Sequence, residues 1–238
     1  MLYALVNGVK SEATPNGKAL CPFCDHKMIA KCGEFVSWHW AHERAANCDS
    51  WYQPETEWHR KWKAVFGKDN CEIILNKDGI KHIADIKTIH GCVIELQNSP
   101  INYEKLIERE DFYGPDMIWI INGIQFADNF KILPIHGLEY DTYTPEFDRF
   151  AKMHGFTPNY SSEKNTGRFE WKRPKKVWSL AGANVYIDFG NEFLFKINKW
   201  SSDSKGIGDQ ISKKQFISNH GGNISLLSGL WSINKSLE

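Results

Sequence analysis

No stretch of this chain is apolar for long enough to cross a membrane, because a spanning helix needs about 20 such residues in a row. The first residues, MLYALVNGVKSEATPNG, also lack the cationic start and the long apolar core of a secretion signal. The sequence therefore predicts a cytoplasmic protein with no membrane partner. In that compartment the six cysteines are expected to be thiols or metal ligands rather than a disulfide framework.

Net charge is absent as well, since 29 Lys and Arg residues balance 29 Asp and Glu residues. The charges are unevenly spread: residues 151–238 carry 13 basic and 7 acidic side chains, whereas residues 1–150 carry 16 and 22. A length of 238 residues with 10 Trp and 14 Phe supplies apolar material for one large or two small domains. This composition excludes a disordered chain.

Cysteines and histidines gather in the first fifty residues. Cys21 and Cys24 are separated by two residues, a spacing at which a tight turn directs both sulfurs to one point, and His39 and His42 follow as a second close pair. Four such ligands suit tetrahedral zinc in a closed structural site, and Cys48 could replace one histidine. The alternative is a set of free thiols beside a histidine-rich surface.

A helix is predicted over residues 54–67, where apolar residues recur at helical spacing between a proline and a glycine. Glu55, His59 and Lys63 are spaced four residues apart and line one side of that helix. They form either an exposed face of ion pairs or part of a functional site.

Residues 71–97 contain three short segments rich in Ile and Val. Turn signals at Asp78-Gly79 and at His90-Gly91 separate them, which predicts an antiparallel meander.

Two carboxylates fall among the apolar residues of the second and third strands. Asp85 alternates onto one face with Ile83 and Lys87, and Glu95 shares a face with Gln97. Carboxylates buried on adjacent strands repel one another unless a cation lies between them. Mg²⁺ takes one or two protein carboxylates and otherwise keeps water or phosphate oxygens, so the pair indicates a magnesium site.

A second helix and a buried strand are predicted next. Ser99 as N-cap and Pro100 at the first position start a helix in which Arg109 and Tyr113 share a face. Residues 117–122 are apolar on both faces, as in a fully buried strand. The order helix, three strands, helix, strand predicts a compact α/β core.

The C-terminal part carries less information. Residues 184–197 predict a hairpin that turns at Gly190-Asn191, with Asp188 as a turn residue, and residues 201–210 predict a mobile loop. Residues 169–178 interleave aromatic and basic side chains, which could grip phosphates and stack on bases or could form a solvated turn. The basic residues of this segment are Lys172, Arg173, Lys175 and Lys176.

Several of these motifs occur in the order found in a known family. CPFC…HWAH, ETEWHRKWK, HIADIKT…GCVIELQNSPI and MIWIING resemble the competence protein CoiA-like family of bacteria and their phages, over about residues 15–125. The resemblance implies a zinc-knuckle segment (1–53), a nuclease-like core of the PD-(D/E)xK restriction-endonuclease type (54–125) and a β-rich α+β part of unknown role (126–238).

The resemblance also implies roles for individual residues. Asp85 and Glu95 would hold a catalytic Mg²⁺ or Mn²⁺, and Gln97 stands where many members carry the catalytic lysine. Glu55 and His59 match the motif of the first helix.

Lys63 follows these two residues at the usual offset and is predicted as a further catalytic residue. Lys87, Arg109 and Tyr113 are predicted to contact nucleic acid beside the active site, together with the four basic residues of the segment 169–178.

The leading hypothesis is therefore a Mg²⁺-dependent deoxyribonuclease that acts on single- or double-stranded DNA. A neutral amide at Gln97 cannot neutralise an anionic transition state, so a DNA-binding or recombination-assisting protein without catalytic activity is the alternative. Other recombination or phage proteins are predicted as further partners. A zinc-organised protein-interaction module is a third hypothesis.

Overall fold

The computed structural model describes residues 1–34, 37–44, 48–51, 53–134, 153 and 166–226. The chain divides into two compact units, one formed by residues 1–94 with 220–226 and the other built on residues 95–219. Both combine helices with β-rich sheets, which confirms the predicted mixed α/β class. Among the described residues no helix is long and apolar enough to cross a membrane.

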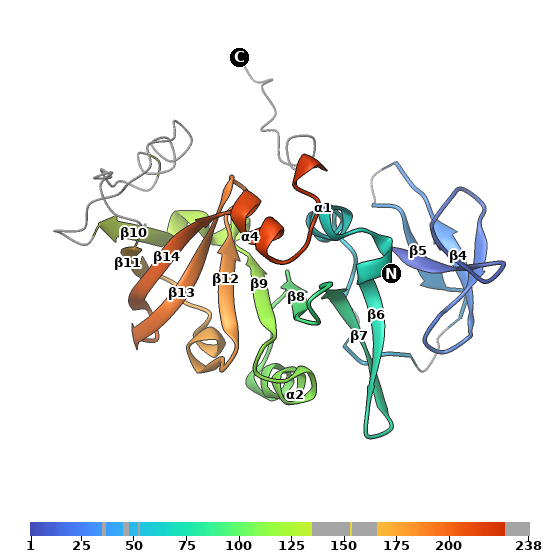
Figure 1. The fold of residues 1–238 in the computed structure, drawn as a ribbon, viewed down its shortest axis with the longest axis horizontal. Coiled ribbons are helices and arrows are strands. Elements are labelled where there is room, and N and C mark those ends of the chain that lie inside the picture. The colour runs from blue at the N-terminus through green and yellow to red at the C-terminus, as the bar shows by residue number, and fades with distance from the viewer. Residues whose placement is uncertain (35–36, 45–47, 52, 135–152, 154–165, 227–238) are drawn as a thin grey trace, which may run out of the picture. The chain divides into compact units, whose positions relative to one another are not determined.

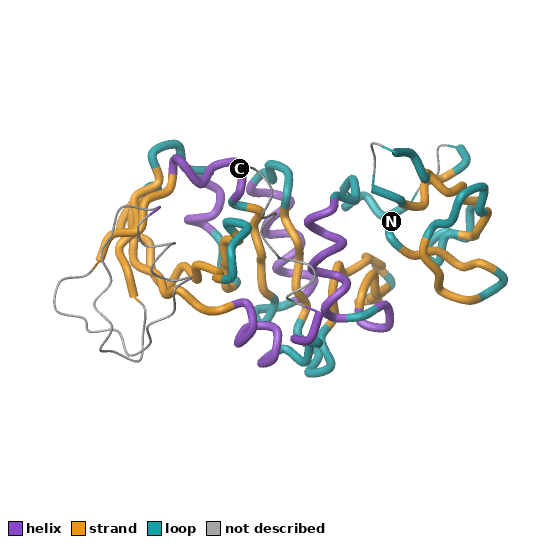
Figure 2. Tube along the Cα trace, turned by 90° about the horizontal axis from the view of Figure 1, so that it is seen from above, coloured by secondary structure: helices purple, strands orange, loops and turns teal. Residues whose placement is uncertain are grey.

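The first unit begins with a five-stranded antiparallel sheet in the order β2-β1-β3-β4-β5. The strands are β1 (Tyr3–Val6), β2 (Val9–Glu12), β3 (Lys18–Leu20), β4 (Lys27–Lys31) and β5 (His39–His42). Trp40, Met28 and Cys21 pack in its small apolar core, and the Trp40 indole donates a hydrogen bond to the Ser11 carbonyl at 2.9 Å. In Figure 2 the described residues of this segment form strands and loops. The sequence had predicted only a metal-organised segment here, without a sheet.

Helix α1 (Glu57–Phe66) confirms the first predicted helix but starts later than Pro54. Thr56 is the N-cap, and its hydroxyl accepts a hydrogen bond from the His59 N–H while the His59 ring accepts one from the Thr56 N–H. This capping box satisfies two helix-end donors, so it fixes the N-cap two residues after the proline and the first helical residue three residues after it. The short helix η1 (Lys68–Asn70) follows.

The predicted meander starts in this unit. Strands β6 (Cys71–Lys77) and β7 (Ile80–Lys87) pair as an antiparallel hairpin around the Asp78-Gly79 turn. The first residues of β8 (Val93–Gln97) pair antiparallel with the end of β7, as the His90-Gly91 turn predicted. The last described element, η4 (Ile224–Leu226), also belongs to this unit.

The second unit contains a sheet in the order β10-β11-β14-β13-β12-β9, whose strands lie side by side in Figure 1. The β9–β12 pair is parallel and the other pairs are antiparallel. The strands are β9 (Ile118–Asn122), β10 (Phe130–Pro134), β11 (Thr166–Trp171), β12 (Asn184–Asp188), β13 (Phe193–Ser202) and β14 (Lys205–Ser212). The remaining elements are α2 (Tyr103–Tyr113), η2 (Ile124–Asn129), η3 (Lys176–Leu180) and α4 (Lys213–Asn219).

Two sequence predictions need correction in this unit. The N-cap of α2 is Asn102, whose side chain accepts from the Lys105 N–H at 2.9 Å, and Ser99 is not the cap. Residues 201–210 are no loop, because they form the end of β13, a tight turn and most of β14. Gly206 and Gly208 lie on β14, where a Cβ would collide with the Phe169 and Phe195 rings. This packing explains why glycine occurs at these two positions of the strand.

Asp188 is a turn residue, as predicted, because its carboxylate accepts from the Gly190 N–H at 2.8 Å. It also forms a buried ion pair with the Lys213 ammonium at 2.7 Å, which the sequence did not indicate.

Candidate functional site

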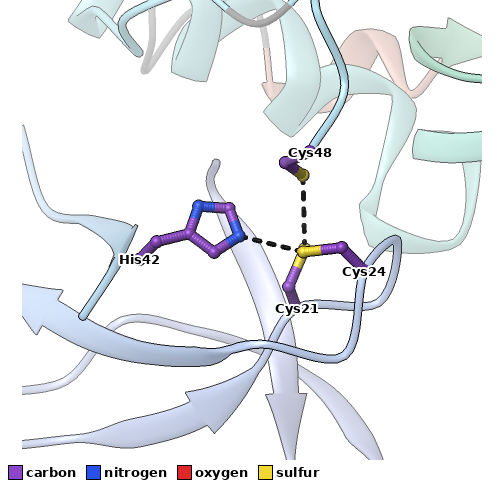
Figure 3. Close-up of side chains that lie close together, drawn as sticks. All are labelled: Cys21, Cys24, His42 and Cys48. Carbon is purple, nitrogen blue, oxygen red and sulfur yellow. Dashed lines mark hydrogen bonds between the residues drawn. The ribbon is translucent and has the colours of Figure 1, made fainter. Parts of the chain in front are cut away.

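Four metal-ligating side chains meet in the first unit. The sulfurs of Cys21, Cys24 and Cys48 and a ring nitrogen of His42 all lie within 4.8 Å of one another, and Figure 3 shows the four side chains directed at a common point. The turn after Cys21 is closed by two backbone hydrogen bonds, from Cys21 N–H to His26 and from Asp25 N–H to Cys21. That turn places two sulfurs of the cluster next to each other.

The cluster has the dimensions of a zinc site. Bond lengths of about 2.3 Å to sulfur and about 2.0 Å to nitrogen put tetrahedral ligand atoms roughly 3.5–3.8 Å apart. Cys21 Sγ and Cys48 Sγ are 3.8 Å apart, and Cys24 Sγ and His42 Nε2 are 3.2 Å apart. With three thiols and one imidazole the group could hold zinc in a closed, structural shell.

The thiols of the cluster differ in acidity. Burial raises the pKa of Cys21, and it raises the pKa of Cys48 to about 12. Burial also opposes ionisation of Cys24, but hydrogen bonds from His26 and from the neighbouring thiols outweigh it and hold the pKa of Cys24 below its usual value. Zinc must displace protons from the two more basic thiols to bind.

His39 lies outside the group, and Cys48 takes its place. Both histidines are on β5, where residues three apart point to opposite faces because side chains alternate along a strand. The His39 ring instead contacts the Ser37 carbonyl at 2.8 Å. All four members of the cluster were among the residues predicted from the sequence, but the two histidines could not be ranked before the strand was known.

A second polar cluster surrounds Lys63 in the same unit. Its ammonium lies 2.9 Å from Glu55 Oε2, 3.0 Å from Glu72 Oε1 and 3.3 Å from Asp85 Oδ1. The side chains of Lys63, Glu55 and Glu72 are at most 5% exposed, whereas that of Asp85 is 25% exposed. The structure thus brings together three of the predicted site residues and one that the sequence did not indicate, Glu72.

Glu72 is held in an unusual backbone conformation opposite Asp85. The β6–β7 register places it between the pairs Cys71–Ile86 and Ile73–Ala84, and its φ of 48° is left-handed. Its carboxylate accepts from the Leu2 and Tyr3 N–H groups at 2.7 and 2.8 Å. Burial opposes its ionisation, but the Lys63 ammonium, the N-terminal ammonium and these N–H groups outweigh burial and lower the pKa of Glu72 to about 2. No sequence signal marks this residue.

The cluster gathers three carboxylates around one ammonium. Glu55, Glu72 and Asp85 all contact Lys63, and Glu72 also accepts hydrogen bonds from two backbone N–H groups. Among the residues that the structure describes, the buried Glu55 Oε1 has no hydrogen-bond partner, a costly arrangement for a polar oxygen. Because Glu55 Oε2 and Asp85 Oδ1 contact the same nitrogen, they lie within about 6 Å of one another. Glu55 and Asp85 therefore fit a divalent cation by donor type and by charge.

His59 is buried on α1 beside these groups. Its Nδ1 belongs to the capping box, where it lies 2.7 Å from the Thr56 hydroxyl and 3.2 Å from the Thr56 nitrogen. This nitrogen is therefore engaged in the hydrogen bonds that cap the N-terminus of α1.

The remaining predicted residues of the α/β core lie as follows. Glu95 and Gln97 are buried on β8, and Glu95 Oε2 accepts from Arg109 Nη1 at 2.8 Å. The Gln97 amide donates to the Ser99 carbonyl at 2.7 Å. Lys87 on β7 and Tyr113 on α2 are half-buried. Asp85 belongs to the first unit and Glu95 to the second, and the predicted magnesium pair remains a prediction.

The basic segment of the second unit follows β11. Lys172, Arg173 and Lys176 are exposed, whereas Lys175 is half-buried with its ammonium 5.2 Å from the centre of the Phe126 ring. An open pocket of about 610 Å³ includes Lys172 and Lys176 in its wall. Lys176 pairs with Asp203 at 3.4 Å, so part of the positive charge is compensated within the protein.

Comparison with known proteins bears on the metal cluster. Residues 10–50 match the family model described as the N-terminal domain of the competence protein CoiA. No curated protein and no solved structure matches the chain. The matched segment contains all four residues of the metal cluster, which supports a CoiA-like N-terminal segment with a zinc site.

Proposed function

We propose that the protein is a metal-dependent nuclease that hydrolyses DNA phosphodiester bonds. The observation that carries this proposal is the convergence of Glu55 and Asp85 on the Lys63 ammonium, with an Asp85 side chain that is 25% exposed and a buried Glu55 oxygen that has no hydrogen-bond partner among the described residues. A divalent cation would use these carboxylates as ligands, since Mg²⁺ or Mn²⁺ binds oxygen ligands of this type. The CoiA-like N-terminal segment and the chain order helix, three strands, helix, strand support the same proposal.

The cation would polarise a phosphoryl oxygen and lower the pKa of an attacking water. Asp85 reaches the solvent and would be its main ligand, with Glu55 Oε1 as a second donor. Lys63 acts as a positioning residue, because its ammonium contacts three carboxylates and fixes the positions of Glu55 and Asp85. Lys172, Arg173 and Lys176 would hold the DNA backbone.

Replacing Asp85 by Asn should abolish DNA cleavage. An amide has similar size but lacks the charge that holds Mg²⁺, so we expect at least a roughly 100-fold loss of rate. The assay is nicking of supercoiled plasmid and degradation of single-stranded DNA with Mg²⁺ or Mn²⁺. Asp78→Asn is the matched control: Asp78 lies in the turn of the same hairpin with φ of 53°, a conformation that Asn adopts readily.

Cleavage that persists in Asp85→Asn would remove Asp85 from the site. Salt-dependent DNA binding without nicking in the presence of any metal would establish the non-catalytic alternative. One observation favours that alternative: the Gln97 amide is neutral and is engaged with Ser99, so it supplies no positive charge to a phosphate.

A further inference from the structure

A polar clasp joins the fourth ligand of the metal cluster to β7. We define the clasp as Asp49, Trp51 and His82. Asp49 Oδ1 accepts from His82 Nδ1 at 2.9 Å, and Asp49 Oδ2 accepts from the Ile83 N–H at 2.7 Å. The two oxygens of one carboxylate thus bind two successive residues of the strand.

Trp51 contacts both other members of the clasp, Asp49 and His82. Its backbone N–H donates to Asp49 Oδ1 at 3.0 Å, and its ring stacks on the His82 imidazole with centroids 3.3 Å apart and planes 5° apart. All three side chains of the clasp are about 90% buried or more. A carboxylate buried to this degree is stable only while its acceptor sites are filled, so its geometry tolerates little displacement.

The clasp follows the metal cluster directly along the chain. Cys48 is a member of the cluster and Asp49 is the next residue, so their Cα atoms are about 3.8 Å apart. Fixing the Cys48 sulfur on zinc therefore restricts where the Asp49 carboxylate can lie. At the other end, Ile83 is two residues before Asp85 on the same strand.

We propose that Asp49 couples zinc binding in the Cys48 cluster to the order of β7. Zinc orders the Cys48–Asp49 segment, the carboxylate holds the His82 ring and the Ile83 amide, and the strand that carries Asp85 is thereby fixed. Asp49 is a positioning residue in this scheme. The coupling to β7 stands on its own, and only its consequence for catalysis at Asp85 rests on the proposed nuclease function.

Coupling of this kind is reciprocal. If zinc binding stabilises the hydrogen-bonded clasp by some factor, the intact clasp must increase the zinc affinity by the same factor. For coupled sites this factor is roughly 5- to 150-fold. A residue that stabilises the zinc-bound and zinc-free forms equally has no such effect.

Hydrogen–deuterium exchange of the full chain with and without zinc tests the proposal. In the wild type, zinc should slow exchange of the Ile83 amide and of residues 80–87 by roughly 10- to 100-fold. In Asp49→Ala that zinc-dependent protection should disappear although one zinc still binds. The zinc affinity, measured against a competing chelator, should fall in the variant by a similar factor.

Two further variants keep the test decisive. Glu43→Ala is the matched control, because Glu43 also follows a ligand of the cluster, His42, but its side chain is exposed. It should leave both readouts unchanged. If Asp49→Ala does not fold, Asp49→Asn keeps the volume and one acceptor and should show partial coupling.

The proposal is overturned if zinc protects residues 80–87 equally in the wild type and in the Asp49 variants. It is also overturned if zinc has no effect on that segment of the wild type. Neither readout involves DNA, so a failure of the coupling is distinct from a failure of the nuclease proposal.

Discussion

One zinc ion per chain should co-purify with the protein, and Cys24→Ser or His42→Ala should release it. The residues around Cys21 form only a small apolar core, so the N-terminal sheet depends on another source of stability. Structural zinc supplies about 10–16 kcal/mol of apparent binding free energy in small domains. Its loss should therefore unfold residues 1–42, seen as a loss of strand signal in circular dichroism that follows the zinc content.

The ligand set predicts a sharp difference between neighbouring residues. His39→Ala should retain zinc because His39 lies outside the cluster, and Cys92→Ser is a second control because Cys92 is a half-buried cysteine of another segment. Zinc loss in His39→Ala with retention in Cys48→Ser would show that the other ligand set is the true one.

Lys63→Met should destabilise the first unit by about 3–5 kcal/mol, the cost of leaving buried charges without their partner. Methionine fills a similar volume, but Glu55, Glu72 and Asp85 would lose their shared ammonium. Lys61→Met on the same helix is the control, since Lys61 is less buried and should change stability by less than about 0.5 kcal/mol. Urea-induced unfolding measures both variants.

The pH dependence of that loss identifies its cause. The pKa of Glu72 is lowered from 4.5 to about 2 in the folded protein, so its contribution is complete above pH 4.5 and is lost as the pH falls toward 2. Without Lys63 the buried Glu72 carboxylate takes up a proton more readily, so the deficit of the variant should shrink between about pH 7 and about pH 4. A deficit that is constant over this range would mean that lost packing, and not unpaired charge, destabilises the variant.

The sequence predicted the elements whose periodicity is strong. The β6–β7 hairpin, the buried strand β9 and the β12–β13 hairpin each combine an apolar pattern with a clear turn signal. The N-terminal sheet was missed because its strands span only three to five residues, too few for a pattern to show. The Gly-Ser composition of residues 201–210 indicated a loop, whereas the glycines are required by the aromatic rings packed on them.

The candidate site was predicted in part for a similar reason. Spacing along the helix indicated that Glu55 and Lys63 share a face, and alternation placed Asp85 on one side of its strand. Glu72 and Asp49 have no local signal, because both act on residues brought near only by folding. Their roles depend on long-range pairing, which one sequence does not contain.

Binding of Mn²⁺, followed by its electron paramagnetic resonance signal, tests for the cation site without requiring catalysis. We expect the wild type and Asp78→Asn to bind one Mn²⁺ with the same affinity. Glu55→Gln and Asp85→Asn should each weaken that binding by at least about tenfold, since each removes one charged ligand. Unchanged Mn²⁺ binding in both variants would contradict a cation site built on Glu55 and Asp85.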